Sequence, residues 1–254
     1  MIAGGPIQYT AAFAAAFLAG AINSVAGGGT LVTFPMLLWL GLPSVTANAT
    51  NTVAIWPGSL GSLWGFRREL AQTDPRMRWM VIPCLLGGGT GAMLLRMTPP
   101  GIFDQLVPFL ILFATVLFSL QPVVQRWLGH RASGWFAGAM VFQFLVGVYG
   151  GYFGAGMGIM MLTALSLMGM TDILKMNALT SLFALCINGV AAILFIAAGM
   201  VYWPFVLTMA VGAILGGYGA AGIARRVGKK AVRRCVIAIG FTIALVLFVR
   251  MAAR

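Results

Sequence analysis

Charged residues are scarce in this 254-residue sequence, where Asp, Glu, Lys and Arg together make up 8% of the chain. A typical soluble domain has about 25%, so a soluble globular protein is excluded. Acids are the rarer of the two charges, with four Asp or Glu against sixteen Lys or Arg, and there is one His. An intramembrane enzyme would need a nucleophile with its base, or a set of metal ligands, inside its apolar segments. None of the four acids lies at the centre of such a segment, which argues against an enzyme.

Two further absences narrow the function. The cysteines Cys84, Cys186 and Cys235 are isolated and form no CxxC pair. Neither a disulfide framework nor a metal site is therefore expected. No GxxxxGK[ST] motif occurs, which excludes a P-loop ATPase site in this chain but leaves a separate ATPase subunit open. We expect no cofactor and no bound metal.

Apolar residues dominate what is present, since 61% of the chain is hydrophobic and the mean hydropathy is +0.98. Several apolar runs reach the roughly 20 residues that a helix needs to cross a bilayer core of about 30 Å. The sequence therefore predicts an all-α polytopic membrane protein. The first run lacks the cationic start of a signal peptide, so we expect it to be retained as a membrane segment. The net charge of +12 comes mostly from short loops between apolar runs, so the expected partner is the lipid bilayer and no nucleic acid.

Two glycine-rich stretches interrupt the apolar runs: GAINSVAGGGTL at 20–31 and GVYGGYFGAGMG at 147–158. Each glycine costs a helix roughly 1 kcal/mol relative to Ala. Unwound backbone persists in a membrane only where protein buries it or where it lines an aqueous cavity. Matched breaks in the two halves of a chain indicate the substrate site of a transporter.

The chain reads as two repeats in one integral membrane domain, at 1–121 and 128–254. A shift of 127 to 129 residues aligns Gly27 with Gly154, Gly41 with Gly169, and Asn48 with Asn177. Each repeat holds five apolar segments. They lie at 8–24, 30–40, 44–66, 79–96 and 102–121, and at 135–152, 157–169, 176–198, 201–222 and 233–250.

Because five is odd, the second repeat should be inverted in the membrane. The cations agree, since loops 67–78, 122–134 and 224–234 are basic while 97–101 and 199–204 hold no Lys or Arg. The positive-inside rule then makes the three basic loops cytoplasmic. The short segments 30–42 and 157–169 cover only half a bilayer, and whether they cross fully or form re-entrant hairpins stays open. Asp172 and Lys175, three residues apart, are expected to pair as an ion pair at a loop end.

A glycine loop leading into a helix presents unpaired backbone N–H groups, and the helix dipole adds roughly half a positive charge. Two such loops would make an anion site without a buried Lys or Arg. Ser, Thr and Asn near them also have a purely structural explanation, because they cap and bridge helices. The candidate substrate-binding residues are Asn23, Ser24, Gly27, Gly28, Gly29, Thr30, Asn48, Asn51, Tyr152, Gly154, Gly156, Met157, Asn177, Thr180 and Ser181.

The motif AGGGTLVTFPMLLWLGLPSVTANATNT at 26–52 and its counterpart GGYFGAGMGIMMLTALSLMGMTDILKMNALTS at 150–181 carry a resemblance over nearly the whole chain. They resemble the TauE/SafE (sulfite exporter) family of membrane permeases. The resemblance implies transport of sulfur-containing anions such as sulfite, sulfonates or thiosulfate, or of other small organic anions. A multi-pass protein of the bacterial inner (plasma) membrane is the matching expectation.

The leading hypothesis is a secondary transporter that moves a small anion, such as sulfite, thiosulfate or sulfoacetate, by rocking of two inverted halves. An anion channel of the same architecture is the first alternative, which saturation of flux would distinguish. A transporter for a small carboxylate or a metal cation is the second. Direction of transport, coupling ion and a possible homo-oligomer stay open.

Overall fold

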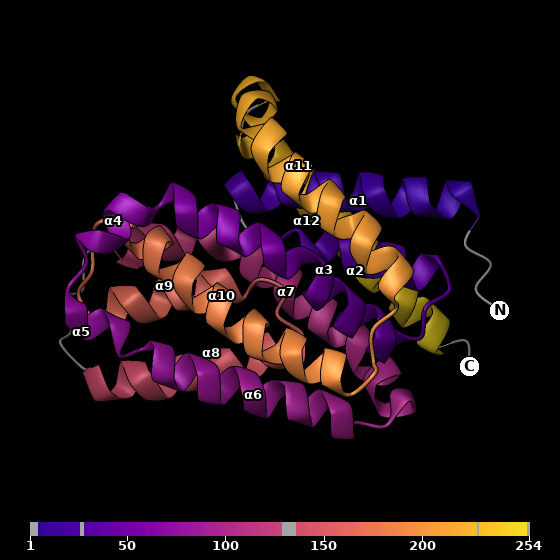
Figure 1. Ribbon diagram of the computed structural model, residues 1–254, viewed down its shortest axis with the longest axis horizontal. Coiled ribbons are helices and arrows are strands. Elements are labelled where there is room, and N and C mark those ends of the chain that lie inside the picture. The colour runs from indigo at the N-terminus through magenta and orange to yellow at the C-terminus, as the bar shows by residue number, and fades with distance from the viewer. Residues whose placement is uncertain (1–4, 26–27, 129–135, 228, 253–254) are drawn as a thin grey trace.

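The computed structural model describes residues 5–25, 28–128, 136–227 and 229–252, and these ranges contain helices and no strand (Figure 1). The first five helices are α1 (Pro6–Val25), α2 (Thr30–Trp39), α3 (Ser44–Gly65), α4 (Arg67–Ala71) and α5 (Pro75–Arg78). They are followed by α6 (Val81–Met97), α7 (Pro100–Leu128), α8 (Phe136–Tyr152) and α9 (Met157–Leu167). The last three are α10 (Ile173–Ala197), α11 (Trp203–Val227) and α12 (Lys229–Ala252). The expectation of an all-helical chain is confirmed for the described residues.

Four stretches of helix are long and apolar enough to cross a membrane: Pro75–Met97, Pro100–Leu120, Ile173–Ala197 and Arg234–Met251. Shorter apolar helices lie at Thr30–Trp39, Phe136–Tyr152, Met157–Leu167 and Trp203–Gly217. Large apolar side chains such as Trp64, Leu207 and Leu245 are exposed on the outside of the bundle, where lipid would cover them. The protein is an integral membrane protein.

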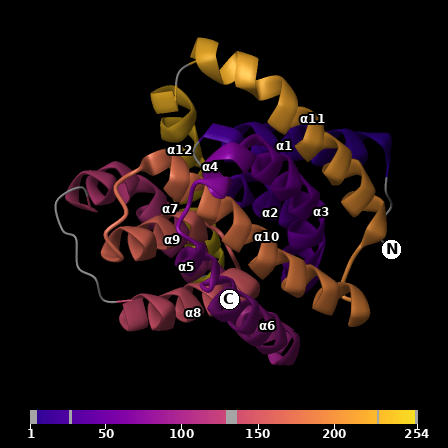
Figure 2. The same ribbon diagram turned by 60° about the vertical axis from the view of Figure 1, so that its left-hand side comes forward.

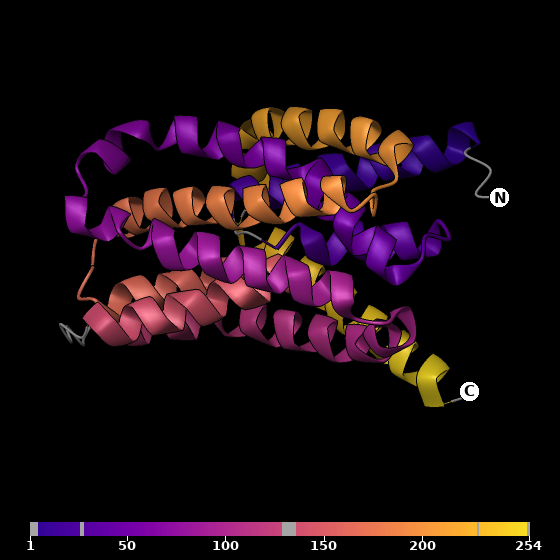
Figure 3. The same ribbon diagram turned by 60° about the horizontal axis from the view of Figure 1, so that its bottom comes forward.

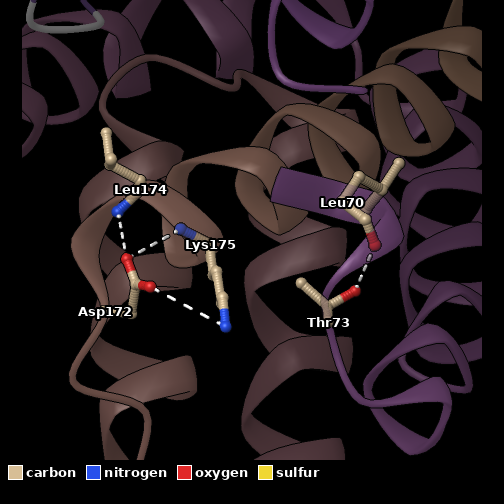
Figure 4. A network of polar contacts seen from close by, with 5 residues as sticks. All are labelled: Leu70, Thr73, Asp172, Leu174 and Lys175. Carbon is tan, nitrogen blue, oxygen red and sulfur yellow. Dashed lines mark hydrogen bonds and ion pairs between the residues drawn. The ribbon is translucent and has the colours of Figure 1, made fainter. Parts of the chain in front are cut away.

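Local chemistry sets several helix ends. Gly41 and Gly169 follow the two short helices with φ of +90° and +87°, a left-handed conformation that favours glycine. Asp172 begins α10, because its carboxylate accepts hydrogen bonds from the backbone N–H of Leu174 at 3.0 Å and of Lys175 at 3.3 Å (Figure 4). The expected ion pair is confirmed, with Lys175 Nζ 3.9 Å from the Asp172 carboxylate.

The three basic loops are more helical than expected. Loop 67–78 contains α4 and α5, where the Asp74 side chain caps Arg76 N–H at 2.8 Å and Pro75 takes the first position of α5. Residues 122–128 belong to α7, whereas 129–134 lie outside the described residues. The segment 224–234 consists of the end of α11 and the start of α12, apart from residue 228, which is not described. Ala, Lys and Arg are good helix formers, so helices continue beyond the point where hydropathy ends.

Two tight helix pairs flank the bundle: α11 lies against α1, and α6 lies against α8. Figures 1 and 2 place α11 and α1 together at one edge and α6 at the opposite edge. Both pairs meet through glycine. A Cβ added to Gly20 or Gly216 would collide with the backbone carbonyl of Ala213 or Phe17, and one added to Gly91 would collide with that of Val148. Small residues let membrane helices approach backbone to backbone.

The middle of the bundle holds the short helices and two long ones. Helices α3 and α10 contact each other, and the Trp56 indole N–H donates to the Leu185 carbonyl at 3.1 Å. Trp56 reaches this carbonyl because Gly189 leaves room for its ring. Helix α7 contacts α12, α9, α3 and α2. This arrangement puts the polar first turns of α3 and α10 beside the two short helices.

The two ends of the bundle carry different connections. The start of α1, the end of α12 and the link from α10 to α11 lie on the right in Figures 1 and 3, while α4, α5 and the loop from α9 to α10 lie on the left. Arg67, Arg68, Arg76 and Arg78 of α4 and α5 therefore gather at the left-hand end. A charge difference between the two ends is what the positive-inside rule uses to orient a membrane protein.

Candidate functional site

The first glycine turn, of which Gly28 and Gly29 are described, connects α1 to α2. Gly28 has a φ of +102°, and a Cβ on it would lie 2.9 Å from the Phe118 ring. The Gly29 N–H donates to the Asn23 side-chain oxygen at 2.8 Å. Asn23 thus has a local role in closing the turn. Gly27 and the side chain of Ser24 lie outside the described residues, and Thr30 is buried at the start of α2.

The second glycine turn, 153–156, connects α8 to α9 and contains two left-handed residues. Gly154 and Gly156 have φ of +78° and +76°. The Tyr149 hydroxyl donates to the Ala155 carbonyl at 2.6 Å and so fixes the turn. The backbone N–H groups of Ala155, Gly156 and Gly158 donate to no residue that the structure describes. Three donors are therefore unpaired at the N-terminus of α9, where the helix dipole favours an anion.

Helix α7 touches both glycine turns. Phe118 packs against Gly28, and the Ala114 backbone lies 3.4 Å from the position of a Cβ on Gly156. Ala114 and Phe118 are four residues apart, which is about 6 Å along a helix. The aromatic rings of Phe34 on α2 and Phe153 in the second glycine turn also meet, with centroids 5.2 Å apart. These contacts bring elements of the two halves of the chain together.

The start of α3 carries buried polar side chains, and one of them, Asn48, contacts the residue just before the second glycine turn. The Asn48 amide nitrogen donates to the Tyr152 carbonyl at 2.8 Å, across 104 positions of sequence. Asn48 and Asn51 are each 1% exposed, and the side-chain oxygen of each is buried without a hydrogen-bond partner among the described residues. Thr50 is paired, because its hydroxyl accepts the Tyr202 N–H at 2.9 Å. A buried polar atom without a partner is costly, which makes both oxygens candidates for ligand contact.

The corresponding part of α10 lies beside α9. A Cβ on Gly158 would be 3.7 Å from the Thr180 methyl group, and the Thr180 hydroxyl is buried with no partner in the described chain. Asn177 is half-buried one turn earlier, and the Ser181 hydroxyl donates back to its carbonyl at 2.9 Å. The Ser181 bond has a counterpart on α3, where the Thr52 hydroxyl donates to the Asn48 carbonyl at 3.0 Å.

Tyr152 and Met157 flank the second glycine turn. The Tyr152 hydroxyl lies 3.3 Å from the Thr98 hydroxyl, so its polar end points away from the turn toward the α6–α7 connection. The Met157 sulfur lies against Gly150 and packs in the apolar cluster of α6, α8, α9 and α10. Of the candidates predicted from the sequence, Asn48 bonds to the carbonyl of Tyr152, just before the second glycine turn, and Thr180 lies against Gly158, just after it. Asn23 and Gly29 instead bond to each other.

Several residues that contact the glycine turns were missing from the sequence prediction. Asn188 is 9% exposed on α10, and its side-chain oxygen is 3.9 Å from the position of a Cβ on Gly154. An Asn within the apolar run FALCINGVAA is a signal that could have found it, because polar side chains inside membrane helices are costly. Phe118 and Ala114 are apolar residues in an apolar helix, and no sequence signal marks them.

Electrostatically the region is neutral. The buried polar residues in the described ranges are Thr, Ser, Asn and Gln, and no buried side chain among them carries a charge. No three His, Cys, Asp or Glu side chains come together there as metal ligands. Backbone amides, hydroxyls and carboxamides are thus the groups that could contact a substrate.

The sulfite exporter TauE/SafE family matches residues 12–247. A "Probable membrane transporter protein" of Haemophilus influenzae is 32% identical over 231 residues, covering 90% of each chain. A "Probable membrane transporter protein ORF9" of Sinorhizobium is 27% identical over 92% of this chain and 89% of its own. The "Probable membrane transporter protein YfcA" of Escherichia coli K12 is 27% identical, over 92% of this chain and 87% of its own. No solved structure matches the chain. With nearly its whole length matched, the chain belongs to the sulfite exporter TauE/SafE family of membrane transporters.

Proposed function

We propose that this membrane transporter is a secondary transporter (permease) of a small anion. The substrate class is a sulfur-containing oxyanion or organosulfonate, such as sulfite, thiosulfate or sulfoacetate, bound near the membrane midplane between the two glycine turns. The observation that carries the proposal is the second glycine turn. It leaves three N–H groups unpaired, at Ala155, Gly156 and Gly158, and the buried, uncharged Asn48 side chain bonds to the carbonyl of Tyr152, just before the turn.

Such a site suits an anion that must be released again. Oriented amides at a helix N-terminus offer hydrogen bonds and a partial positive charge without a buried ammonium or guanidinium group. The family's name, sulfite exporter, favours a sulfur oxyanion within the anion class.

The helix contacts support two inverted repeats, 1–121 and 128–254, in one membrane domain. In the two repeats, α1, α2, α3, α6 and α7 correspond in order to α8, α9, α10, α11 and α12. The contacts α1–α11, α3–α11 and α2–α12 therefore correspond to α8–α6, α10–α6 and α9–α7, and all six are present. Helix α3 also contacts its own counterpart α10, and α7 contacts its own counterpart α12. On this account α1–α2 and α8–α9 are re-entrant hairpins that enter from opposite sides, and the halves rock about them.

The repeats and the basic segments together give an orientation. We place 67–78, 122–134 and 224–234 at the cytoplasmic side of a bacterial inner membrane, with both chain ends outside. The lipid bilayer is the expected surrounding and a homo-oligomer is a possible assembly; neither nucleic acid nor enzymatic activity has a place in this account.

The test is thermal unfolding of the purified protein with sulfite, thiosulfate, sulfoacetate, short carboxylates, Na⁺ and divalent cations. A ligand that binds only the folded state adds about 2.7 kcal/mol to the unfolding free energy at a hundredfold excess over its Kd. Stabilisation by a sulfur oxyanion supports the proposal. The unpaired oxygens of Asn48 and Asn51 are acceptors and favour the cation alternative, so stabilisation by cations alone would overturn the anion assignment.

A further inference from the structure

The second glycine turn presents donors, yet the carboxamides beside it present acceptors. The amide nitrogen of Asn48 already has a hydrogen-bond partner, because it donates to the Tyr152 carbonyl at 2.8 Å. A carbonyl oxygen can only accept, so the carboxamide cannot be flipped without losing this bond. Its oxygen is therefore held in place, 1% exposed as a residue and without a partner among the described residues.

A fully deprotonated oxyanion cannot satisfy both kinds of group. Its oxygens would accept from the N–H groups of Ala155, Gly156 and Gly158, but it would turn another oxygen lone pair toward the Asn48 oxygen. A dianion would also enter a region in which no buried side chain of the described ranges carries a positive charge. Burying charge without a counter-charge is costly, and two charges cost more than one.

We propose that the site selects a singly charged oxyanion that keeps one hydroxyl group, and that the side-chain oxygen of Asn48 accepts a hydrogen bond from this hydroxyl. The anionic oxygens of such a ligand accept from the N–H groups at the start of α9, while its O–H donates to the Asn48 oxygen. Hydrogen sulfite and hydrogen selenite belong to this class; sulfonates, which lack a hydroxyl, and dianions do not. The inference rests on the proposed anion transport and narrows its substrate class: of the anions named there it keeps sulfite and leaves out thiosulfate, a dianion, and sulfoacetate, a sulfonate. It also names the residue that decides between ligands.

Sites built to bond a hydroxyl discriminate strongly, because the analogue without it leaves a buried polar group unpaired. A lost hydrogen bond to a buried group corresponds to roughly a tenfold or larger loss of affinity. We therefore expect hydrogen sulfite to bind at least about tenfold more tightly than methanesulfonate, a monoanion without a hydroxyl.

The experiment measures Kd for sulfite, selenite and methanesulfonate on the purified full-length protein by calorimetry across pH 6 to 9. If only the protonated monoanion binds, the apparent Kd for total sulfite rises about tenfold per pH unit once sulfite loses its proton. The midpoint must lie higher for selenite than for sulfite, by the difference between their own second pKa values. Methanesulfonate must give a flat profile.

Titrating protein groups would behave differently, since they would shift all three profiles at one common pH. Among the side chains that the structure describes, the titratable groups on the elements packed against α3 and the second glycine turn are Tyr9, Cys84, Arg96, Asp104, Tyr149, Tyr152, Asp172, Lys175, Cys186 and Tyr202, with Arg67, Arg68 and Glu69 of α4. Asp104 is linked to the same helix turn, because its carboxylate accepts a hydrogen bond from the hydroxyl of Ser44, four residues before Asn48. If the apparent Kd of all three ligands changed with the same pH midpoint, and this pH dependence disappeared in Asp104→Asn, the inference would be overturned.

A variant pair assigns the discrimination to Asn48. In Asn48→Leu, the affinity for hydrogen sulfite should fall to that for methanesulfonate. Thr52→Val removes only a hydroxyl bonded to the Asn48 carbonyl, so this variant should keep the preference for hydrogen sulfite over methanesulfonate. If Asn48→Leu does not fold, the wild-type profiles decide alone. Sulfite binding that is independent of pH, or strongest as the dianion, contradicts the inference but leaves anion transport standing. Absence of binding by every oxyanion contradicts the proposed function itself.

Discussion

Replacing Gly156 by Ala tests the second glycine turn most sharply, because Gly158, two residues on, provides a matched control. Gly156 has a φ of +76°, and an added Cβ would meet the Ala114 backbone at 3.4 Å, which is ordinary contact. The space therefore suffices, and the cost is conformational. An L-residue held in the left-handed region loses about 1–2 kcal/mol.

Gly158 lies inside α9, and its added Cβ would be 3.7 Å from the Thr180 methyl group. Alanine is favoured over glycine in a helix by about 0.5–1 kcal/mol. We therefore expect Gly156→Ala to lower the unfolding free energy by about 1–2 kcal/mol and Gly158→Ala to leave it unchanged or raise it. The difference between the two variants should be about 2 kcal/mol.

Thermal unfolding in detergent, followed by tryptophan fluorescence, measures the difference. Substrate binding should fall in Gly156→Ala, since relaxing this φ reorients the neighbouring N–H groups, and should persist in Gly158→Ala. Leu at Gly28 or Gly156 should abolish binding while the protein still inserts in the membrane. A Gly158→Ala variant that is less stable than Gly156→Ala would refute the assigned turn geometry.

Three further predictions concern the bundle. Gly91→Ala should destabilise the α6–α8 pair strongly, because its Cβ meets the Val148 backbone, whereas Gly89→Ala, with 3.5 Å of space, should be tolerated; equal thermal stability would contradict the packing. Trp56→Phe should cost about 0.6 kcal/mol of unfolding free energy through its lost hydrogen bond, and no change would show that bond to be unimportant. Single cysteines at Arg68 and Pro99 in a cysteine-free background should be labelled from opposite sides of the membrane; labelling from one side would refute the orientation.

Hydropathy and glycine placement predicted most of the fold. The expected segments 44–66 and 79–96 correspond to α3 (Ser44–Gly65) and α6 (Val81–Met97), because apolar length and helix length agree where lipid sets both. The aligned Gly41 and Gly169 proved to be positive-φ residues that end the two short helices. Hydropathy wrongly predicted a loop at 224–234, where α11 ends and α12 begins. Helix propensity, and not contact with lipid, decides where a basic helix ends.

The candidate site could be predicted only in part. Composition and spacing indicated the glycine turns, but the bond from Asn48 to the Tyr152 carbonyl joins residues 104 apart, and a weak repeat does not specify which side chain reaches which turn. The packing of Phe118 and Ala114 against the two turns depends on how α7 crosses the bundle. That crossing follows from tertiary packing, which no local pattern encodes. Asn188 was missed although its polarity within an apolar run could have marked it.

The most direct test of the central claim is counterflow of radiolabelled sulfite in proteoliposomes containing the purified wild-type protein. The account predicts uptake that saturates with external sulfite, is accelerated by unlabelled sulfite inside, and is reduced in Gly156→Ala but kept in Gly158→Ala. Uptake that never saturates and ignores internal sulfite would mean a channel. No sulfite flux, with flux of a cation in its place, would contradict an anion site at the second glycine turn.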